Sequence, residues 1–182
     1  MRLRVLVLLT AFCLPLPMVA DTVYSYTGNN FTDVSPGIEG YVYSTSDSIT
    51  GSFTVSSPLG DNFSGDVTPA SFSFSDGVQT IDSADSGDIF TFEVTTDGSG
   101  TIDDWDISVV DWIIFPYLSN SIETTTSGDS GDEFLIGGGS NTSGGTWKSA
   151  VVAATPEPGS LVLLGTGLLG MAGTLRRRIR QS

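Results

Sequence analysis

Between residues 21 and 155 the chain alternates apolar and polar residues in short runs that are separated by Gly, Asp, Asn and Ser. Successive side chains of a β-strand point to opposite faces of a sheet, so this alternation predicts strands with one buried face. No stretch of this region shows the clean 3.6-residue stripe of an amphipathic helix. The clearest runs are residues 49–55, 72–74, 90–94 and 105–109, and further strands are expected at 23–27, 41–45, 78–82, 111–118, 134–136 and 146–152.

About nine short strands at this spacing predict an all-β domain, either an antiparallel β-sandwich or a jelly roll, with a closed barrel as the alternative. The sequence Asp97-Gly98-Ser99-Gly100 separates two of the runs and predicts a hairpin turn, because Gly adopts the positive φ values that tight connections need. Residues 119–146 are rich in Ser, Thr and Gly, and we expect them to form a mobile loop region rather than core.

The first 20 residues have the pattern of a secretory signal peptide, which would direct the chain to the secretion translocon. Arg2 and Arg4 provide the positive start, residues 5–14 are apolar, and the small residue Ala20 precedes the expected cleavage site before Asp21. The alternative is an uncleaved N-terminal anchor. Two prolines interrupt the apolar run, however, and leave it short for a membrane span.

Near the other end of the chain, two prolines precede a second apolar stretch. Pro156 and Pro158 hold Glu157 in extended backbone, because proline fixes its own φ and restricts the residue before it. Residues 159–175 are apolar and, at about 25 Å as a helix, form a thin but sufficient transmembrane segment. The sequence therefore predicts a single C-terminal transmembrane helix.

A basic cluster follows this stretch directly and consists of Arg176, Arg177, Arg178 and Arg180. Positive residues beside a membrane span stay on the cytoplasmic side, so everything before the span is expected outside. The predicted organisation is a signal peptide at 1–20, a β-sandwich ectodomain at 21–150, a linker at 151–158, a transmembrane helix at 159–175 and a cytoplasmic tail at 176–182.

Residues 155–182 resemble the PEP-CTERM sorting domain of exported proteins from certain Gram-negative bacteria, since they combine the Pro-Glu-Pro triplet, a Gly-rich apolar helix and a basic end in the order and spacing of that family. The resemblance implies recognition by an exosortase, a membrane protease and transferase that would cut near Pro156 to Pro158. It also implies a destination at the cell surface or in the extracellular polysaccharide matrix. The alternative is a plain C-terminal anchor whose prolines only separate domain and helix.

The expected ectodomain is strongly acidic and lacks cysteine. Twenty of the 21 acidic residues lie between Asp21 and Thr155. Of the seven basic residues in the whole chain, only Lys148 lies there, so this region has a net charge of −19. Nucleic acid is therefore excluded as a partner, because almost no positive charge is present to neutralise phosphates. The single cysteine, Cys13, lies in the signal peptide, so the mature domain has no disulfide and depends on its core.

The chain contains no histidine, which excludes a Ser-His-Asp triad and imidazole acid-base catalysis, and we expect no catalytic activity. Asp85-Ser86-Gly87 and Asp129-Ser130-Gly131 mimic the paired triplets of aspartic proteases, in which two carboxylates share one proton. Those enzymes need two lobes, and this domain has room for one. A role in turns is therefore the favoured interpretation of both triplets.

Two alternative functions remain open for the ectodomain. A carbohydrate-binding module would stack sugars on aromatic rings such as Trp105, Trp112, Trp147, Tyr24, Tyr26, Tyr41 and Tyr43. A glycoside hydrolase would need two carboxylates at a suitable distance, and the candidates are Glu39, Glu93, Glu123, Glu133 and the many Asp residues. No cofactor is expected, although oxygen ligands for calcium occur at residues 97–104 and at Asp82, Asp85 and Asp88, without the full EF-hand pattern.

Overall fold

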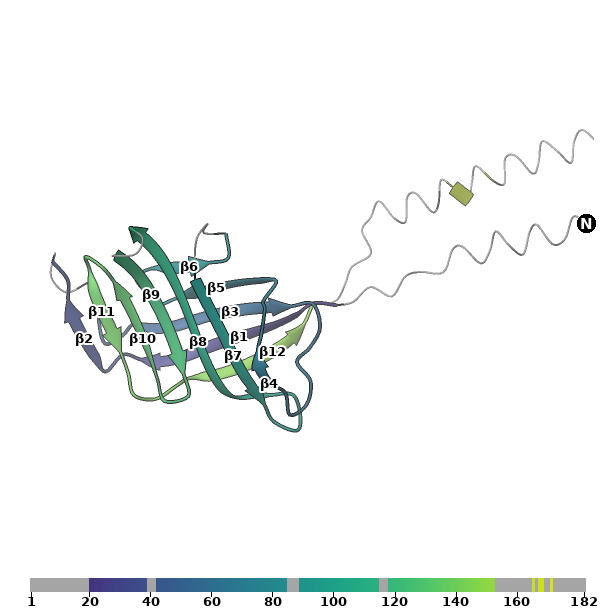
Figure 1. Ribbon diagram of the computed structural model, residues 1–182, viewed down its shortest axis with the longest axis horizontal. Helices are drawn as coiled ribbons and strands as arrows, with labels where there is room; N and C mark the ends of the chain where they lie inside the picture. Colours follow the sequence, from purple (N-terminus) through teal and green to yellow (C-terminus); the bar gives the residue numbers. More distant parts are fainter. Residues whose placement is uncertain are drawn as a thin grey trace, which may run out of the picture. The chain divides into compact units, whose positions relative to one another are not determined.

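The computed structural model describes residues 20–38, 42–84, 89–114 and 118–152, together with Gly165, Gly167, Leu168 and Met171. Residues Ala20–Val152 form one compact unit (Figure 1). Its described residues contain twelve β-strands, which pair antiparallel in two sheets. The prediction of an antiparallel all-β domain is therefore confirmed.

The sheets contain five and seven strands. The first has the order β12-β1-β3-β5-β6, with β12 at Thr146–Val151, β1 at Thr22–Asn30, β3 at Ser48–Val55, β5 at Ser71–Ser75 and β6 at Thr80–Asp82. The second has the order β2-β11-β10-β9-β8-β7-β4, with β2 at Asp33–Pro36, β11 at Gly137–Ser140, β10 at Gly128–Glu133, β9 at Leu118–Thr125, β8 at Ile102–Ile114, β7 at Ile89–Thr96 and β4 at Ser64–Asp66. From β7 to β11 consecutive strands are neighbours, so most of the second sheet is a meander.

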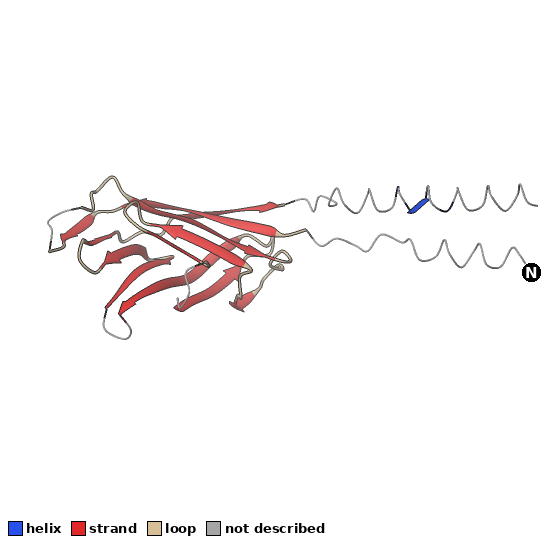
Figure 2. Ribbon diagram, turned by 90° about the horizontal axis from the view of Figure 1, so that it is seen from above, coloured by secondary structure: helices blue, strands red, loops and turns tan. Residues whose placement is uncertain are grey.

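The two sheets pack face to face around one aromatic core (Figure 2). Phe53 on β3 meets Phe92 on β7 edge to face, with ring centroids 5.4 Å apart. Tyr26 on β1 meets Trp105 on β8 in the same way at 5.7 Å. Aromatic pairs in this geometry stabilise a core beyond the area that they bury. This arrangement fits the predicted β-sandwich.

The period-two alternation corresponds to buried and outward positions. Ile49 and Phe53 on β3 are fully buried, whereas Thr50 between them is exposed. The predicted hairpin between β7 and β8 is also present. The Asp97 amide closes the turn by donating a hydrogen bond to the Thr101 carbonyl at 2.8 Å. Gly100 in this turn adopts a positive φ of +77°.

Residues 105–109 and 111–118 are not two strands, because Ile102–Ile114 is a single strand, β8. Val110 pairs with Ile89 on one side and with Ser121 on the other, so the ladder continues through this position. Local alternation cannot distinguish two short strands from one long strand, since the apolar period is the same in both.

The expectation of a mobile loop at residues 119–146 is wrong. Most of β9 and all of β10 and β11 lie there, and Ile122 and Asp129 on these strands are buried. The glycines permit close packing. A Cβ atom at Gly131 would collide with Asp76, and one at Gly139 would collide with Phe31. Composition alone suggested a loop, whereas tertiary packing requires small residues in these strands.

Two expected strands are absent from the described residues. Residues 134–136 form the turn between β10 and β11, in which the Ile136 amide donates to the Glu133 carbonyl at 3.0 Å. Residues 42–45 have no strand pairing, although Tyr43 is buried. In that segment the Tyr43 side chain joins the core although its backbone pairs with no strand.

Several predicted features lie outside the described residues. They include the signal peptide up to residue 19, the Pro156-Glu157-Pro158 triplet and the arginine cluster. Of the predicted transmembrane helix, Gly165, Gly167, Leu168 and Met171 are described and are helical. Among all described residues, no helix has the length and apolar character needed to cross a membrane.

Candidate functional site

The two ends of the folded domain lie side by side. Strands β1 and β12 pair so that Thr22 is opposite Val151, and the Val152 amide donates to the Asp21 carbonyl at 2.7 Å (Figure 1). Of the predicted processing residues, the structure describes Ala20, which is half-buried, and Asp21, which is exposed. A cut between them would leave every residue of β1 in place, because that strand begins at Thr22.

The Asp129-Ser130-Gly131 triplet lies in strand β10, so its interpretation as a turn is wrong. The Asp129 side chain is 2% exposed and points into the core. Its carboxylate accepts hydrogen bonds from the Tyr26 hydroxyl at 2.6 Å, the Thr124 hydroxyl at 2.7 Å and the Asn141 amide at 3.2 Å. The second triplet, residues 85–87, lies outside the described residues.

Burial and these hydrogen bonds change the pKa values of both Asp129 and Tyr26. Burial raises the pKa of the Asp129 carboxyl, and the hydrogen bonds from Tyr26, Thr124 and Asn141 act in the opposite direction. Burial also raises the pKa of the Tyr26 phenol, and its hydrogen bond to Asp129 raises it further. Since β1 and β10 belong to different sheets, the Tyr26–Asp129 pair ties the two layers together.

A second buried carboxylate, that of Asp76, also accepts several hydrogen bonds from the protein and lies at the turn between β5 and β6. Asp76 is fully buried and accepts hydrogen bonds from the Tyr43 hydroxyl at 2.6 Å and from the Val78 and Gln79 amides. The Gln79 side chain then donates to the Asp132 carbonyl of the other sheet at 3.0 Å. Burial, reinforced by the bond to Asp76, raises the pKa of the Tyr43 phenol. Both buried carboxylates therefore serve as structural links.

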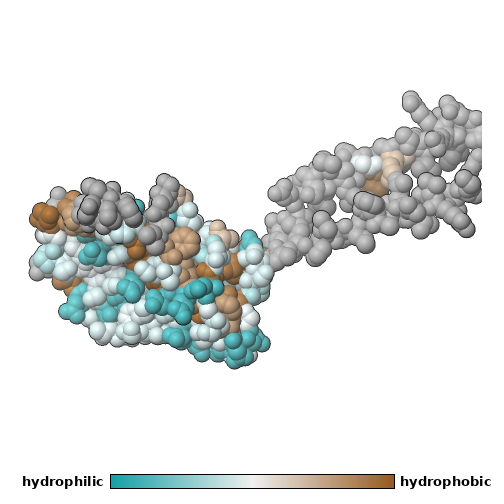
Figure 3. Space-filling view, viewed as in Figure 1, coloured by the Kyte–Doolittle hydropathy of each residue, from teal (hydrophilic) through white to brown (hydrophobic). Residues whose placement is uncertain are grey.

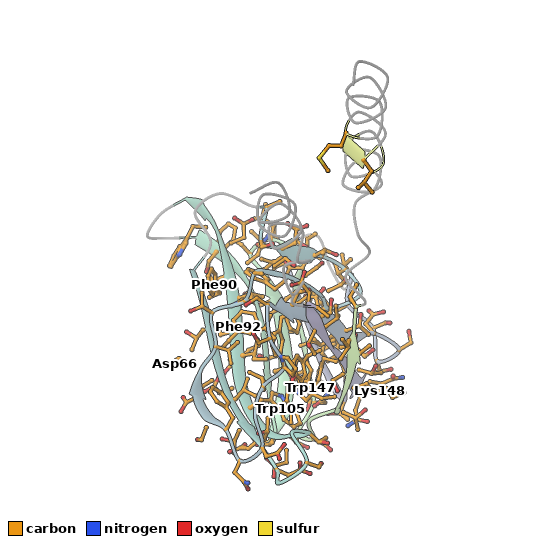
Figure 4. All side chains as sticks on the ribbon, turned by 90° about the vertical axis from the view of Figure 1, so that its right-hand side faces the viewer. Asp66, Phe90, Phe92, Trp105, Trp147 and Lys148 are labelled. Carbon is orange, nitrogen blue, oxygen red and sulfur yellow. The ribbon has the colours of Figure 1, made fainter. Side chains whose placement is uncertain are left out.

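Most of the aromatic residues proposed for sugar stacking are core residues. Trp105 and Trp147 are 9% and 8% exposed and contact each other at 6.1 Å between ring centroids (Figure 4). Tyr24, Tyr26 and Tyr43 are each 2% exposed. None of these five rings can present a face to a sugar without opening the core. Trp112 is half-buried, and Tyr41 lies outside the described residues.

The first calcium candidate is a self-contained hairpin turn. The Asp97 carboxylate accepts hydrogen bonds from the Ser99 amide and hydroxyl at 2.8 and 2.7 Å and from the Thr101 amide at 3.0 Å. The Ser99 contacts, followed by the Thr101 amide, lower the pKa of Asp97. In the part of the chain that the structure describes, no three acidic side chains are grouped so that they could hold a metal ion. Asp85 and Asp88 of the second candidate fall outside that part.

The outer face of the seven-stranded sheet is acidic. Register places Asp66 on β4 opposite Glu93 on β7, and Glu93 opposite Asp106 on β8. All three are exposed, and like charges directly opposite one another in a sheet are destabilising. Hydrophilic residues accordingly lie across the lower part of this face in Figure 3. A shallow hollow of about 190 Å³ beside the row is lined by Glu93, Val94, Thr95, Asp104, Trp105 and Asp106.

The remaining carboxylates proposed for glycoside hydrolysis are dispersed. Glu123 is exposed on β9, between Ser108 and Ser130 of the flanking strands. Glu133 is half-buried at the end of β10, where burial and the charge of Asp76 raise its pKa. Glu39 lies outside the described residues. Among the described residues, register thus brings Glu93 beside two other carboxylates, those of Asp66 and Asp106, on an open face rather than in a cleft.

The outer face of the five-stranded sheet carries aligned hydroxyl groups, a feature that the sequence analysis missed. Alternation along each strand gives the outward residues, but only strand register brings them into rows. One row, from β12 to β6, is Thr146, Thr27, Thr50, Ser75 and Thr80. The next row is Lys148, Ser25, Ser52, Ser73 and Asp82. We call these ten residues the hydroxyl face.

Comparison with known proteins identifies the C-terminal segment. The PEP-CTERM protein-sorting motif matches residues 154–178, which include the Pro156-Glu157-Pro158 triplet and Arg176 to Arg178. This motif is a sorting signal of exported proteins that are processed at the membrane by an exosortase-type enzyme. No curated protein and no solved structure matches the chain.

Proposed function

Because the chain carries a PEP-CTERM protein-sorting motif at residues 154–178, we propose that it is an exported protein whose folded domain is delivered to the cell surface or the extracellular matrix without catalytic activity of its own. The motif match is the observation that carries this proposal. Partners in processing are the secretion translocon and an exosortase-type membrane enzyme. The extracellular partner in this proposal is polysaccharide, and nucleic acid is not a partner of so acidic a domain.

In this proposal the precursor is held at both ends before processing. The signal peptide at residues 1–20 engages the translocon and is cut between Ala20 and Asp21. Residues 159–175 cross the membrane as a helix, with Arg176 to Arg180 on the cytoplasmic side. Exosortase then cuts near Pro156 to Pro158 and releases or re-attaches the exported part.

The geometry of the domain supports this route. The N- and C-terminal connections start at Asp21 and Val152, which are joined by a backbone hydrogen bond. Two segments that leave a domain at one point can enter the same membrane without pulling β1 and β12 apart. Neither proposed cleavage removes a residue from these two strands, so the domain would keep its fold after processing.

The absence of catalysis is supported by the placement of the carboxylates. Asp129 and Asp76 are buried and saturated by hydrogen bonds from the protein, so they have no access to a substrate. The Glu93–Asp106 pair lies on an open face, whereas glycosidases hold their two carboxylates around a bound sugar. A glycoside hydrolase is therefore the weaker alternative.

The experiment that tests the proposal is mass spectrometry of the protein released by a bacterium with an active exosortase and by the same bacterium lacking that enzyme. We expect a product that begins at Asp21 and ends near Pro156 to Pro158 in the first strain, and retained precursor in the second. Release of identical full-length protein from both strains would refute the proposal.

A further inference from the structure

The hydroxyl face is uncharged across its centre. Lys148 and Asp82 stand at its two edges, and between them only Ser and Thr side chains occur in the two rows. A third row adds Ala150, Val23, Thr54 and Ser71. Figure 4 shows Lys148 and Asp66 on opposite flanks of the domain, with core aromatic residues between them. The two outer faces of the domain therefore differ in charge: one is acidic and the other is nearly neutral.

The hydroxyl groups of this face are available for hydrogen bonding. Ser75 donates to the Gln79 carbonyl at 2.7 Å. The other Ser and Thr hydroxyls of the two rows make no hydrogen bond to the residues that the structure describes. Each hydroxyl can donate one hydrogen bond and accept two, and it rotates freely to suit a partner. The face thus offers both donors and acceptors at every strand.

The spacing of the rows is regular. Neighbouring strands lie about 4.8 Å apart, so the row from Thr146 to Thr80 repeats a hydroxyl group at that interval across all five strands, and the row from Lys148 to Asp82 repeats it across the three central strands. This interval is close to the length of one pyranose unit in an extended polysaccharide. A chain lying across the strands would place successive sugar hydroxyls over successive strands. One hydrogen bond contributes little by itself, and repetition along the row supplies the affinity.

Other classes of partner fit the face poorly. Protein interfaces are enriched in aromatic residues, Met and Arg, and none of these occurs in the three rows. A lipid surface would require exposed apolar side chains. An anionic polymer would be repelled by a domain of net charge −19, in which Lys148 is the single cation. A neutral polyol needs neither charge nor apolar area.

We propose that the hydroxyl face binds a neutral polysaccharide chain that lies across the strands of the five-stranded sheet. The binding requires no aromatic platform, in agreement with the burial of Trp105 and Trp147. It rests on the proposed function, which names extracellular polysaccharide as the partner, and adds the face that binds it and the neutral charge of the polymer. Affinity rises with the number of sugar units until the polymer covers all five strands.

The test is affinity electrophoresis of the full-length chain, purified in a polyoxyethylene detergent that carries no sugar group. Native gels contain hydroxyethylcellulose, galactomannan or dextran as neutral probes, and alginate as the anionic comparison. We expect retardation by at least one neutral polymer, increasing with polymer length, and none by alginate. The variant Thr27→Val/Thr50→Val keeps the side-chain shape and removes two hydroxyls of one row, so it should bind about tenfold more weakly.

The matched control is Thr91→Val, which removes an exposed hydroxyl from β7 on the other sheet and should bind like wild type. Circular dichroism checks that all variants are folded. Equal retardation of the double variant and wild type, or no retardation by any of the three neutral polymers, overturns the proposal. A change in oligomeric state caused by the double variant, without retardation of wild type, would instead make this face a self-association surface and would also overturn it. Retardation is measured on purified protein, so a failed sorting experiment would leave this result unaffected.

Discussion

Tyr26 on β1 donates a 2.6 Å hydrogen bond to Asp129 on β10, and this bond crosses the core from one sheet to the other. The same hydroxyl accepts the Gly145 amide at 2.5 Å. One phenolic oxygen thus satisfies a buried carboxylate and positions the chain just before β12. Because β12 leads to the sorting segment, this pair also helps to fix the point at which the chain leaves the domain.

Replacement of Tyr26 by Phe should destabilise the domain by about 1–3 kcal/mol, since it leaves the buried Asp129 carboxylate without one donor and the Gly145 amide without its acceptor. Urea unfolding followed by tryptophan fluorescence measures the loss. Tyr24→Phe is the matched control, because the Tyr24 hydroxyl only accepts the half-buried Leu59 amide. An equal effect of the two variants would show that the Tyr26–Asp129 pair has no special role.

Alkaline pH should unfold the domain through its buried tyrosines. The pKa values of Tyr26 and Tyr43 are raised in the folded state, so the folded chain binds more protons than the unfolded chain above about pH 10. Their contribution to stability is complete below that pH and is lost as pH rises through the raised values. Thermal unfolding between pH 8 and 11 measures this decline, and Tyr43→Phe should reduce its slope above pH 10. An unchanged slope would refute the assignment to Tyr43.

Substitution of Gly131 by Ala should destabilise the domain by about 1–3 kcal/mol, because the new methyl group would collide with the Asp76 carboxylate. That carboxylate cannot move aside, since the Tyr43 hydroxyl and the Val78 amide hold it. Gly60→Ala adds the same methyl group in open space and should change stability by less than about 0.5 kcal/mol. Denaturant midpoints compare the two variants. Similar midpoints would mean that the β10 glycine is not required for packing.

Neutralising the centre of the acidic row should stabilise the protein. Glu93→Gln removes the repulsion from Asp66 and Asp106 and should raise stability by about 0.5 kcal/mol at low ionic strength. The gain should shrink as salt screens these exposed charges. Glu123→Gln is the matched control, because serines flank Glu123 on both sides. Melting temperatures of the wild type and both variants at about 10 mM and about 500 mM salt measure the gain in stability. A gain for Glu93→Gln that is the same at both salt concentrations would argue against charge repulsion as its cause.

Glu157→Ala should block processing at the sorting motif, because it removes the charged residue from the Pro156–Pro158 triplet. We expect precursor to accumulate in membranes at the expense of the released form. Fractionation with an antibody against the folded domain measures the distribution. Glu123→Ala removes one acidic residue from the exposed face of the domain and should be released normally. Normal release of the Glu157 variant would contradict recognition of the triplet.

The strands that alternate strictly could be predicted from the sequence. Ile49 and Phe53 on β3 lie in the core because every second residue of a strand points to the same face. The turn at Asp97 to Gly100 was also predictable, because glycine readily adopts a positive φ, as Gly100 does here. The C-terminal sorting motif was recognised from its triplet, apolar run and arginines, because such a signal is read as a linear segment.

Tertiary structure decided the rest, because pairing between strands is a long-range choice that local composition does not encode. Residues 119–146 look like a loop until Phe31 and Asp76 are placed against the glycines of β11 and β10. Asp129 is indistinguishable in sequence from a turn residue until Tyr26, 103 positions earlier, is brought to it. The serines and threonines of the hydroxyl face are scattered along the sequence, and strand register alone aligns them in rows.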